Sequence, residues 1–186
     1  MKKKKGRLTN VILIVILLAG LSLLLYPTLA NWWNSMTQSR AVASYVDAVA
    51  NIDQAQYDHL WDDAWNYNRS LTTRTNAYVL NQEQKENYEK LLDIGGLGIM
   101  GYVEIPSIGV VLPIYHGTDE TVLQIAVGHL EWTSLPVGGE SSHCVVSGHR
   151  GLPSARLFTD LDKLVVGDIF VFRVLDEVLT YEVDQI

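Results

Sequence analysis

The feature that most constrains this chain is an uncharged, mostly apolar run from Leu8 to Leu29. Its length is about what an α-helix needs to cross a bilayer, near 20 residues. Five cationic residues precede it: Lys2, Lys3, Lys4, Lys5 and Arg7. A positive flank of this kind stays in the cytoplasm. The sequence therefore predicts a cytoplasmic flank over 1–7, a transmembrane signal anchor over 8–29 and an extracellular remainder, which excludes a purely soluble protein.

A cleaved signal peptide is the alternative interpretation of this run. Such a peptide has a shorter apolar core that ends in a small-x-small cleavage site. Here "TLA" before Asn31 offers a threonine where a small residue is needed. We therefore favour an uncleaved anchor.

The charge of the chain is unevenly distributed, with a net charge of −7 overall. The five cationic residues of the flank leave nine of the 14 Lys and Arg residues against 21 Asp and Glu, so the exterior part carries about −12. Nucleic-acid binding needs a basic footprint, so no nucleic-acid partner is expected. An acidic exterior can attract cationic partners, although a solvated surface explains most of these charges.

The segment over 30–96 has helical patterning. Apolar residues recur there at helical spacing: Val42, Tyr45, Val46, Val49 and Ile52. This pattern predicts one or two helices between about residues 35 and 68. A loop over 71–82 and a short amphipathic helix over 83–94 should follow, and the pair Gly95-Gly96 should stop that helix.

From residue 97 the pattern changes to short β-rich runs. Strands are expected within 98–117, 143–149, 168–175 and 178–186, with a short helix and a long loop over 118–142. Short strands with few helices favour a mainly β, closed or nearly closed barrel over 97–186. The last strand signal reaches Ile186 without a turn, so we expect a domain that is incomplete at its C-terminus.

Cys144 is the one cysteine among the 186 residues, and His149 lies close to it in the sequence. In an extended chain five steps place these side chains on opposite faces and about 16 Å apart. A Cys–His catalytic pair needs hydrogen-bond reach, about 3 Å. We therefore expect Cys144 to be a core thiol.

The strongest chemical candidate is His149 in "SGHRG". A histidine at the end of a strand, flanked by glycines, can stand at the rim of a site with its ring free. A purely structural histidine is the alternative. Ser147 shares its face, but neighbours two apart in a strand are about 6 to 7 Å from each other, too far for direct proton transfer.

The histidines could also be interpreted as metal ligands. Those in question are His116, His129, His143 and His149. None shows the i, i+4 helical spacing of a zinc-hydrolase helix. We expect no metal and no cofactor.

Four segments carry a resemblance to a known family. They are "GYVEIPSIGVVLPIYHG", "GHLEWTSLPVGGESSH", "VVSGHRGLPSARLFTDLDKL" and "GDIFVF". In this order and spacing they resemble consecutive segments of the sortase family, most closely the pilus-assembling class C transpeptidases. The element "YP..AN" over 26–31 is also similar to that class. The resemblance implies an eight-stranded sortase β-barrel on the outer face of a Gram-positive cell membrane.

The resemblance also implies the site residues. His149 matches the catalytic histidine of the family's Cys–His–Arg site. The family's cysteine follows in a "TLxTC"-like strand and its arginine on a later strand, and neither segment is present in these 186 residues. Cys144 falls where the family has a buried strand residue. We therefore expect this stretch to be an inactive fragment of its parent.

The activity that the resemblance implies is cysteine transpeptidation. The enzyme would cleave LPxTG-type sorting signals of pilins or surface proteins and join pilin subunits through a lysine amine. Two alternatives remain open. One is a housekeeping-type sortase that anchors proteins to the cell wall, and the other is a non-catalytic, membrane-tethered sortase-like binding module.

Three short segments bear on substrate and lid. "LPVGG", from Leu135 to Gly139, resembles an LPxTG signal but lacks the threonine and lies inside the domain. "DAW", from Asp63 to Trp65, resembles the Asp-Pro-aromatic tip of a class C lid but lies in the helical region. The lid is expected over 71–84, where Tyr78 is the aromatic candidate and no Asp-Pro occurs.

Overall fold

The computed structural model describes residues 2–73 and 79–186, with side chains from Arg7 onward. The helices are α1 (Lys2–Asn51), α2 (Gln54–Leu71), α3 (Gln82–Tyr88) and α4 (Glu120–Leu123). The strands are β1 (Ile99–Ile105), β2 (Val110–His116), β3 (Val127–His129), β4 (Val146–Ser147), β5 (Ile169–Val174) and β6 (Glu177–Glu182). Two 3₁₀ turns, η1 (Pro106–Ile108) and η2 (Leu161–Lys163), complete the fold.

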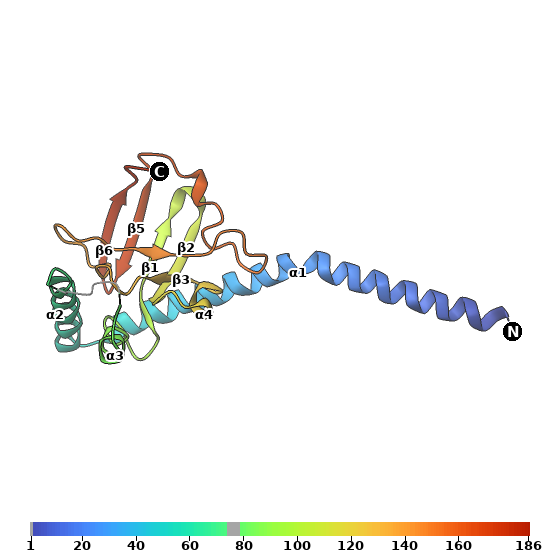
Figure 1. Cartoon of the computed structure of the whole chain (residues 1–186), viewed down its shortest axis with the longest axis horizontal. Helices are drawn as coiled ribbons and strands as arrows, with labels where there is room; N and C mark the ends of the chain where they lie inside the picture. Colours follow the sequence, from blue (N-terminus) through green and yellow to red (C-terminus); the bar gives the residue numbers. More distant parts are fainter. Residues whose placement is uncertain (1, 74–78) are drawn as a thin grey trace.

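Helix α1 contains the whole apolar run and continues without interruption to Asn51. Its first half extends away from the rest of the molecule (Figure 1), and its large apolar side chains there are exposed. By length and composition this helix could cross a membrane. The sequence predicted a separate helix from about residue 35, whereas one helix spans both regions because no helix-breaking residue follows Pro27 in it.

The second half of α1 packs against the sheet. Tyr45 is fully buried, and its hydroxyl donates to the Met100 carbonyl (3.2 Å) and accepts from the Leu175 N–H (2.7 Å). These two bonds join α1 to β1 and to the turn between β5 and β6. Burial raises the pKa of Tyr45, so the hydroxyl stays protonated and can donate.

Helices α2 and α3 begin with side-chain caps. The Asp53 carboxylate accepts from the Gln56 N–H, and Asn81 and Gln84 form a reciprocal capping box at α3. Helix α3 is shorter than the predicted 83–94, because Leu92 has a left-handed backbone (φ 57°) that no helix continues through.

The six strands form one curled sheet in the order β4-β3-β2-β1-β5-β6. Strands β1 and β2 form a hairpin around η1, and Gly109 closes it with a left-handed φ of 65° that glycine adopts without strain. All pairs are antiparallel except β2 with β3. The mainly β prediction is confirmed.

Two features of the sheet differ from the predictions. The sequence predicts a loop where strand β3 forms, because three residues are too few to show a periodicity. Strand β6 ends at Glu182 instead of running to Ile186. The described residues form six strands, and the eight-stranded barrel remains a prediction.

One hydrophobic core joins the helices to the sheet. Helix α2 contributes Ala64 to its fully buried members. The larger of these members come from α1, α3, the strands and the connecting loops: Tyr45, Tyr88, Leu92, Met100, Ile114, Val127, Leu135 and Val174. The helical region therefore packs as part of the β domain and places its side chains against the loops that lead to His149.

Candidate active site

His149 lies just past the end of β4, at one edge of the sheet. Strand β4 pairs only with β3, where Gly128 lies opposite Ser147. At Gly148 an added Cβ would lie 2.8 Å from Val127 Cγ1 and 2.9 Å from a ring atom of Phe158. Glycine is therefore required there, because a larger residue would contact Val127 and Phe158. His149 follows Gly148 directly, at the edge of the sheet.

The His149 ring has one uncommitted nitrogen. About one third of the side chain is exposed (34%), yet Nε2 is covered and has no hydrogen-bond partner among the described residues. The nearest charged atom is Glu120 Oε2 on α4, at 3.8 Å. That distance is too long for a hydrogen bond and short enough for an ion pair when the ring is protonated. Such a nitrogen can exchange a proton with a reacting group.

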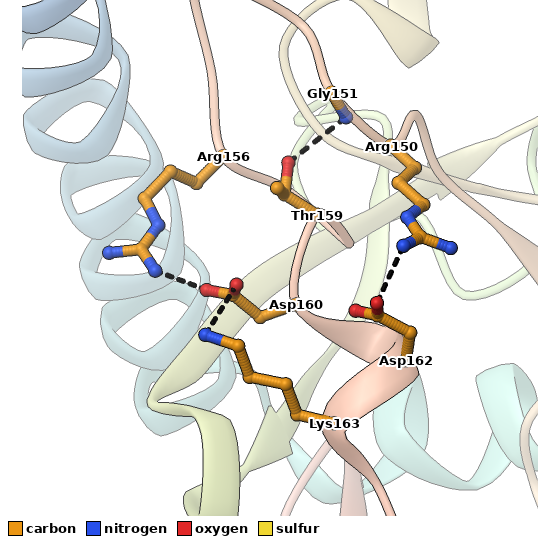
Figure 2. A network of polar contacts seen from close by, with 7 residues as sticks. All are labelled: Arg150, Gly151, Arg156, Thr159, Asp160, Asp162 and Lys163. Carbon is orange, nitrogen blue, oxygen red and sulfur yellow. Dashed lines mark hydrogen bonds and ion pairs between the residues drawn. The ribbon is translucent and has the colours of Figure 1, made fainter.

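The loop that follows His149 is closed by backbone contacts. The Phe158 N–H donates to the His149 carbonyl (3.1 Å), and the Gly151 N–H donates to Thr159 Oγ1 (3.1 Å). Figure 2 shows the second of these contacts beside the Arg150–Asp162 ion pair, whose atoms are 2.6 Å apart. These contacts hold the chain on both sides of the loop at a fixed spacing.

A second ion cluster lies beside the first. Lys163 Nζ is 2.8 Å from an oxygen of Asp160, and Arg156 pairs with the other oxygen (Figure 2). Hydrogen bonds from Lys163 and then Arg156 hold the pKa of Asp160 below its usual value. Because Arg156 and Lys163 are exposed, these ion pairs contribute little to stability, and their effect is to fix the loop's shape.

Cys144 is a partly buried thiol that packs against the core, which agrees with the predicted core position. It lies in the loop before β4 and packs against the core, and burial raises its pKa to about 12. The reason differs from the predicted one, because regular strand structure covers only Val146 and Ser147, and so the alternation of an extended 143–149 strand does not apply. Among the described residues no hydrogen bond joins Cys144 or Ser147 to His149.

His129 is fully buried on β3. Its Nε2 lies 2.8 Å from the Ser134 carbonyl, which can only accept, so Nε2 carries the proton and Nδ1 accepts from the Tyr88 hydroxyl (2.9 Å). Burial lowers the pKa of His129 to about 4. The ring is therefore a neutral, fully bonded part of the core.

The other two histidines are separate from this site. His116 places its ring nitrogens 2.6 Å from the Leu91 carbonyl and 3.2 Å from the Gly98 carbonyl, and His143 is exposed. Within residues 2–73 and 79–186 no three His, Cys, Asp or Glu side chains gather in a group that could hold a metal ion.

The two segments that imitate family motifs have structural roles. Leu135 and Val137 of "LPVGG" are buried, and the Asn68 side chain on α2 bonds both the N–H (2.7 Å) and the carbonyl (3.4 Å) of Leu135. Trp65 of "DAW" lies on α2 and packs directly against Gly139. Tyr78, the lid candidate, lies outside the described residues.

Sequence reasoning missed three residues beside the site. Glu120 faces His149, while Asn31 and Asn34 on α1 bond the loop that follows His149. Two asparagines three positions apart share one helix face, and their place directly after an apolar run was the signal that could have found them. Nothing in the sequence around Glu120 pointed to His149.

Comparison with known proteins gives a consistent assignment. Residues 103–186 match the sortase domain family model. The structure of sortase C1 from Streptococcus agalactiae is similar over 78% of this chain and 76% of that chain, at 46% identity and a TM-score of 0.74. Sortase C of Streptococcus pneumoniae is similar over 78% and 74%, at 41% identity and a TM-score of 0.68.

A lid mutant of the Streptococcus agalactiae enzyme is similar over 77% of this chain and 74% of that chain, at 40% identity and a TM-score of 0.68. A comparison with curated proteins gave no match. Identity of this level over three quarters of both chains exceeds what a shared fold alone produces. The chain therefore belongs to the sortase family, and its solved relatives are class C sortases.

Proposed function

We propose that this protein is the N-terminal part of a membrane-anchored, extracellular class C transpeptidase that joins pilin subunits. The observation that carries the proposal is the 46% identity to sortase C1 over 78% of the chain. The Streptococcus pneumoniae relative is described by its pilin substrate specificity, and another relative belongs to a pilus island. The position of His149 at the rim of the sheet supports a catalytic role for its ring.

In this mechanism a cysteine thiolate attacks the Thr–Gly carbonyl carbon of an LPxTG-type signal. The C–N bond breaks, a thioester forms, and His149 gives its proton to the leaving amine. A pilin lysine amine then attacks the thioester and passes a proton to His149, and the isopeptide bond replaces the C–S bond. An arginine stabilises the oxyanion in both steps.

The thiolate in this mechanism is not supplied by Cys144. A thiol with a pKa near 12 is almost entirely protonated at neutral pH, and protonated thiols are poor nucleophiles. Under the proposal the nucleophile and the arginine lie outside residues 1–186, on strands that complete an eight-stranded barrel. Residues 1–186 contribute His149 and the surface around it.

The apolar half of α1 supports the proposed membrane anchor. Its exposed side chains would be costly in water and are stable in lipid. With the cationic flank inside, protease added to intact cells should degrade the region after Asn31 and leave a tag fused at Met1 intact. Digestion of that tag would reverse the proposed orientation.

A lid is part of the proposal by resemblance, and a lid mutant of the Streptococcus agalactiae relative has been solved. The candidate residue for a lid in this chain, Tyr78, lies outside the described residues.

The decisive test is transpeptidation by a chain that carries the proposed cysteine strand after residue 186. An LPxTG-type peptide should be cleaved and joined to a pilin lysine, with a thioester intermediate that hydroxylamine traps. Joining to cell-wall amines but not to pilin would favour the housekeeping alternative. Binding of the peptide without any cleavage would favour the non-catalytic module and overturn the enzyme assignment.

A further inference from the structure

The face of α1 that follows the apolar run reaches toward the loop after His149. Asn31, Asn34 and Gln38 are three and four positions apart, so they lie on one side of the helix. All three side chains are half-buried, whereas Trp32 and Trp33 between them are exposed. This polar face is therefore directed at the domain.

Each asparagine bonds one backbone group of the loop that follows His149. Asn31 Oδ1 accepts from the Arg156 N–H at 2.9 Å, and Asn34 Nδ2 donates to the Ser154 carbonyl at 2.8 Å. The partners fix the orientation of both amides, because a backbone N–H only donates and a carbonyl only accepts. The two bonds span more than 115 positions of sequence and hold both sides of Ala155.

The bonded loop leads directly back to the candidate site. Phe158, two residues after Arg156, donates its N–H to the His149 carbonyl at 3.1 Å. The loop is thus held at its base by the sheet and at its tip by α1. Ala155, between the two bonded groups, is also buried in the hydrophobic core, so this packing and the α1 bonds together hold the tip. The surface ion pairs add little, because exposed ion pairs constrain a backbone weakly.

The same helix face also holds the other side of the site. Gln38 Nε2 donates to the Ile125 carbonyl at 2.7 Å, two residues after α4. Helix α4 carries Glu120, whose carboxylate is 3.8 Å from His149 Nε2. One helix face therefore bonds the two segments that flank the His149 ring.

We propose that Asn31 and Asn34 are positioning residues for His149. Through them, the position of the loop that follows His149 depends on the membrane-proximal part of α1. The proposal rests on the proposed function for what His149 does there. It gives a physical role to the "YP..AN" element, whose last residue is Asn31. Gln38 extends the same contact to α4.

The two asparagines provide a matched test, because the same substitution has opposite consequences at each. Asn31→Asp keeps an oxygen that accepts from the Arg156 N–H. Asn34→Asp removes the donor and sets a carboxylate oxygen against the Ser154 carbonyl. Ser35→Asp is the charge control, since Ser35 is exposed on the same turns and its side chain makes no hydrogen bond to the loop among the described residues.

The experiment uses the full 186-residue chain in detergent micelles. Hydrogen exchange is measured over 150–158 and over the β1–β2 hairpin, and the His149 imidazole C–H resonance is followed by NMR. Asn31→Ala, Asn34→Ala and Asn34→Asp should each raise exchange of the loop about three- to tenfold and move the His149 resonance, as expected for losing one hydrogen bond. Asn31→Asp, Ser35→Asp and the hairpin in every variant should match the parent.

Equal responses of Asn31→Asp and Asn34→Asp, or unchanged exchange in every variant, would overturn the proposal. If the alanine variants loosen the whole domain, the two aspartate variants decide, because they differ only in donor and acceptor. These readouts need no turnover. In a chain that carries the nucleophile, a His149→Ala variant that still transpeptidates would reject the catalytic role of His149 alone. Unchanged loop exchange would reject the positioning role alone.

Discussion

His129 lies on β3, His149 lies just past the end of the neighbouring strand β4, and the two side chains have opposite surroundings. His129 is fully buried, and both ring nitrogens have partners. His149 lies at the rim, and its Nε2 has no hydrogen-bond partner among the described residues. The residue type therefore does not reveal the role of a histidine by itself. What distinguishes a structural histidine from a candidate catalytic one is whether its ring nitrogens already have hydrogen-bond partners.

The contrast follows from the strands that carry the two residues. Strand β3 is central and pairs on both sides, so His129 meets Tyr88 and Ser134 in the core. Strand β4 is an edge strand of two residues, and the chain leaves the sheet at Gly148. A histidine placed past the end of a strand keeps its ring available, at the cost of needing a loop to hold it.

The largest effect should come from His149→Ala. In a chain that carries the nucleophile, transpeptidation should fall by on the order of 10² or more, because the substitution removes the imidazole proposed to exchange the proton. The free energy of unfolding should change by less than about 1 kcal/mol, since Nε2 makes no hydrogen bond that would be lost. Steady-state kinetics measure the loss of transpeptidation, and urea unfolding measures the change in stability. His143→Ala is the control, because His143 is exposed.

His129 should control the acid stability of the domain. Its folded pKa of about 4 lies below the usual 6.5, so the unfolded chain binds the proton more readily between these values. The neutral ring's contribution is complete above pH 6.5 and is lost as pH falls to 4, about 3 kcal/mol in all. Urea unfolding across this range should show the loss in the parent and in His143→Gln, and a clearly smaller one in His129→Gln. Equal slopes in all three would contradict the assignment.

Tyr88→Phe tests the buried surroundings of His129 by removing one of its hydrogen-bond partners. The Tyr88 hydroxyl contacts His129 Nδ1 (2.9 Å) and accepts from the Gly117 N–H (3.1 Å). Removing it leaves buried groups without partners and should cost about 2 kcal/mol of the free energy of unfolding. Tyr102→Phe is the matched control and should stay within about 0.5 kcal/mol, because Tyr102 is only half-buried. Thermal or urea unfolding measures both.

The smallest effect should come from Cys144→Ala. The thiol packs against the core without a catalytic contact, so the free energy of unfolding should fall by about 1 kcal/mol or less and transpeptidation should persist. Loss of turnover in a normally folded Cys144→Ala enzyme would show that the nucleophile had been misplaced. Iodoacetamide should label Cys144 of the folded 186-residue chain slowly at neutral pH.

The sequence predicted the parts of the fold that have strong local signals. The apolar run and the β-rich runs that form β1, β2, β5 and β6 depend on neighbouring residues. The end of α3 did not follow its prediction, because the helix stops at Tyr88, before the Gly95-Gly96 pair. Strand β3 was not predictable in this way, because its three residues pair in parallel with β2 and in antiparallel with β4. Only the tertiary structure decides such pairings.

The sequence also predicted only one part of the candidate site. His149 was identified from its flanking glycines and from the family resemblance. Two residues on other elements were not identified: Glu120, which faces His149, and Asn31, which bonds the following loop at Arg156 and is more than 100 positions away from His149 in the sequence. Side chains that bond a distant backbone leave no periodic trace in the sequence.

The unbroken course of α1 has a consequence for where such an enzyme could work. From Leu29 to Asn51 the helix rises about 33 Å, and Tyr45 fastens it to the sheet. The helix is continuous between the proposed anchor and the domain, without a flexible linker. The distance between the domain and the lipid surface would therefore stay constant. Pro27, inside the apolar run, lacks one helical N–H bond and is the natural place for the helix to tilt. Substrates would therefore have to reach the domain at the membrane surface, because the continuous helix does not let the domain move away from the membrane.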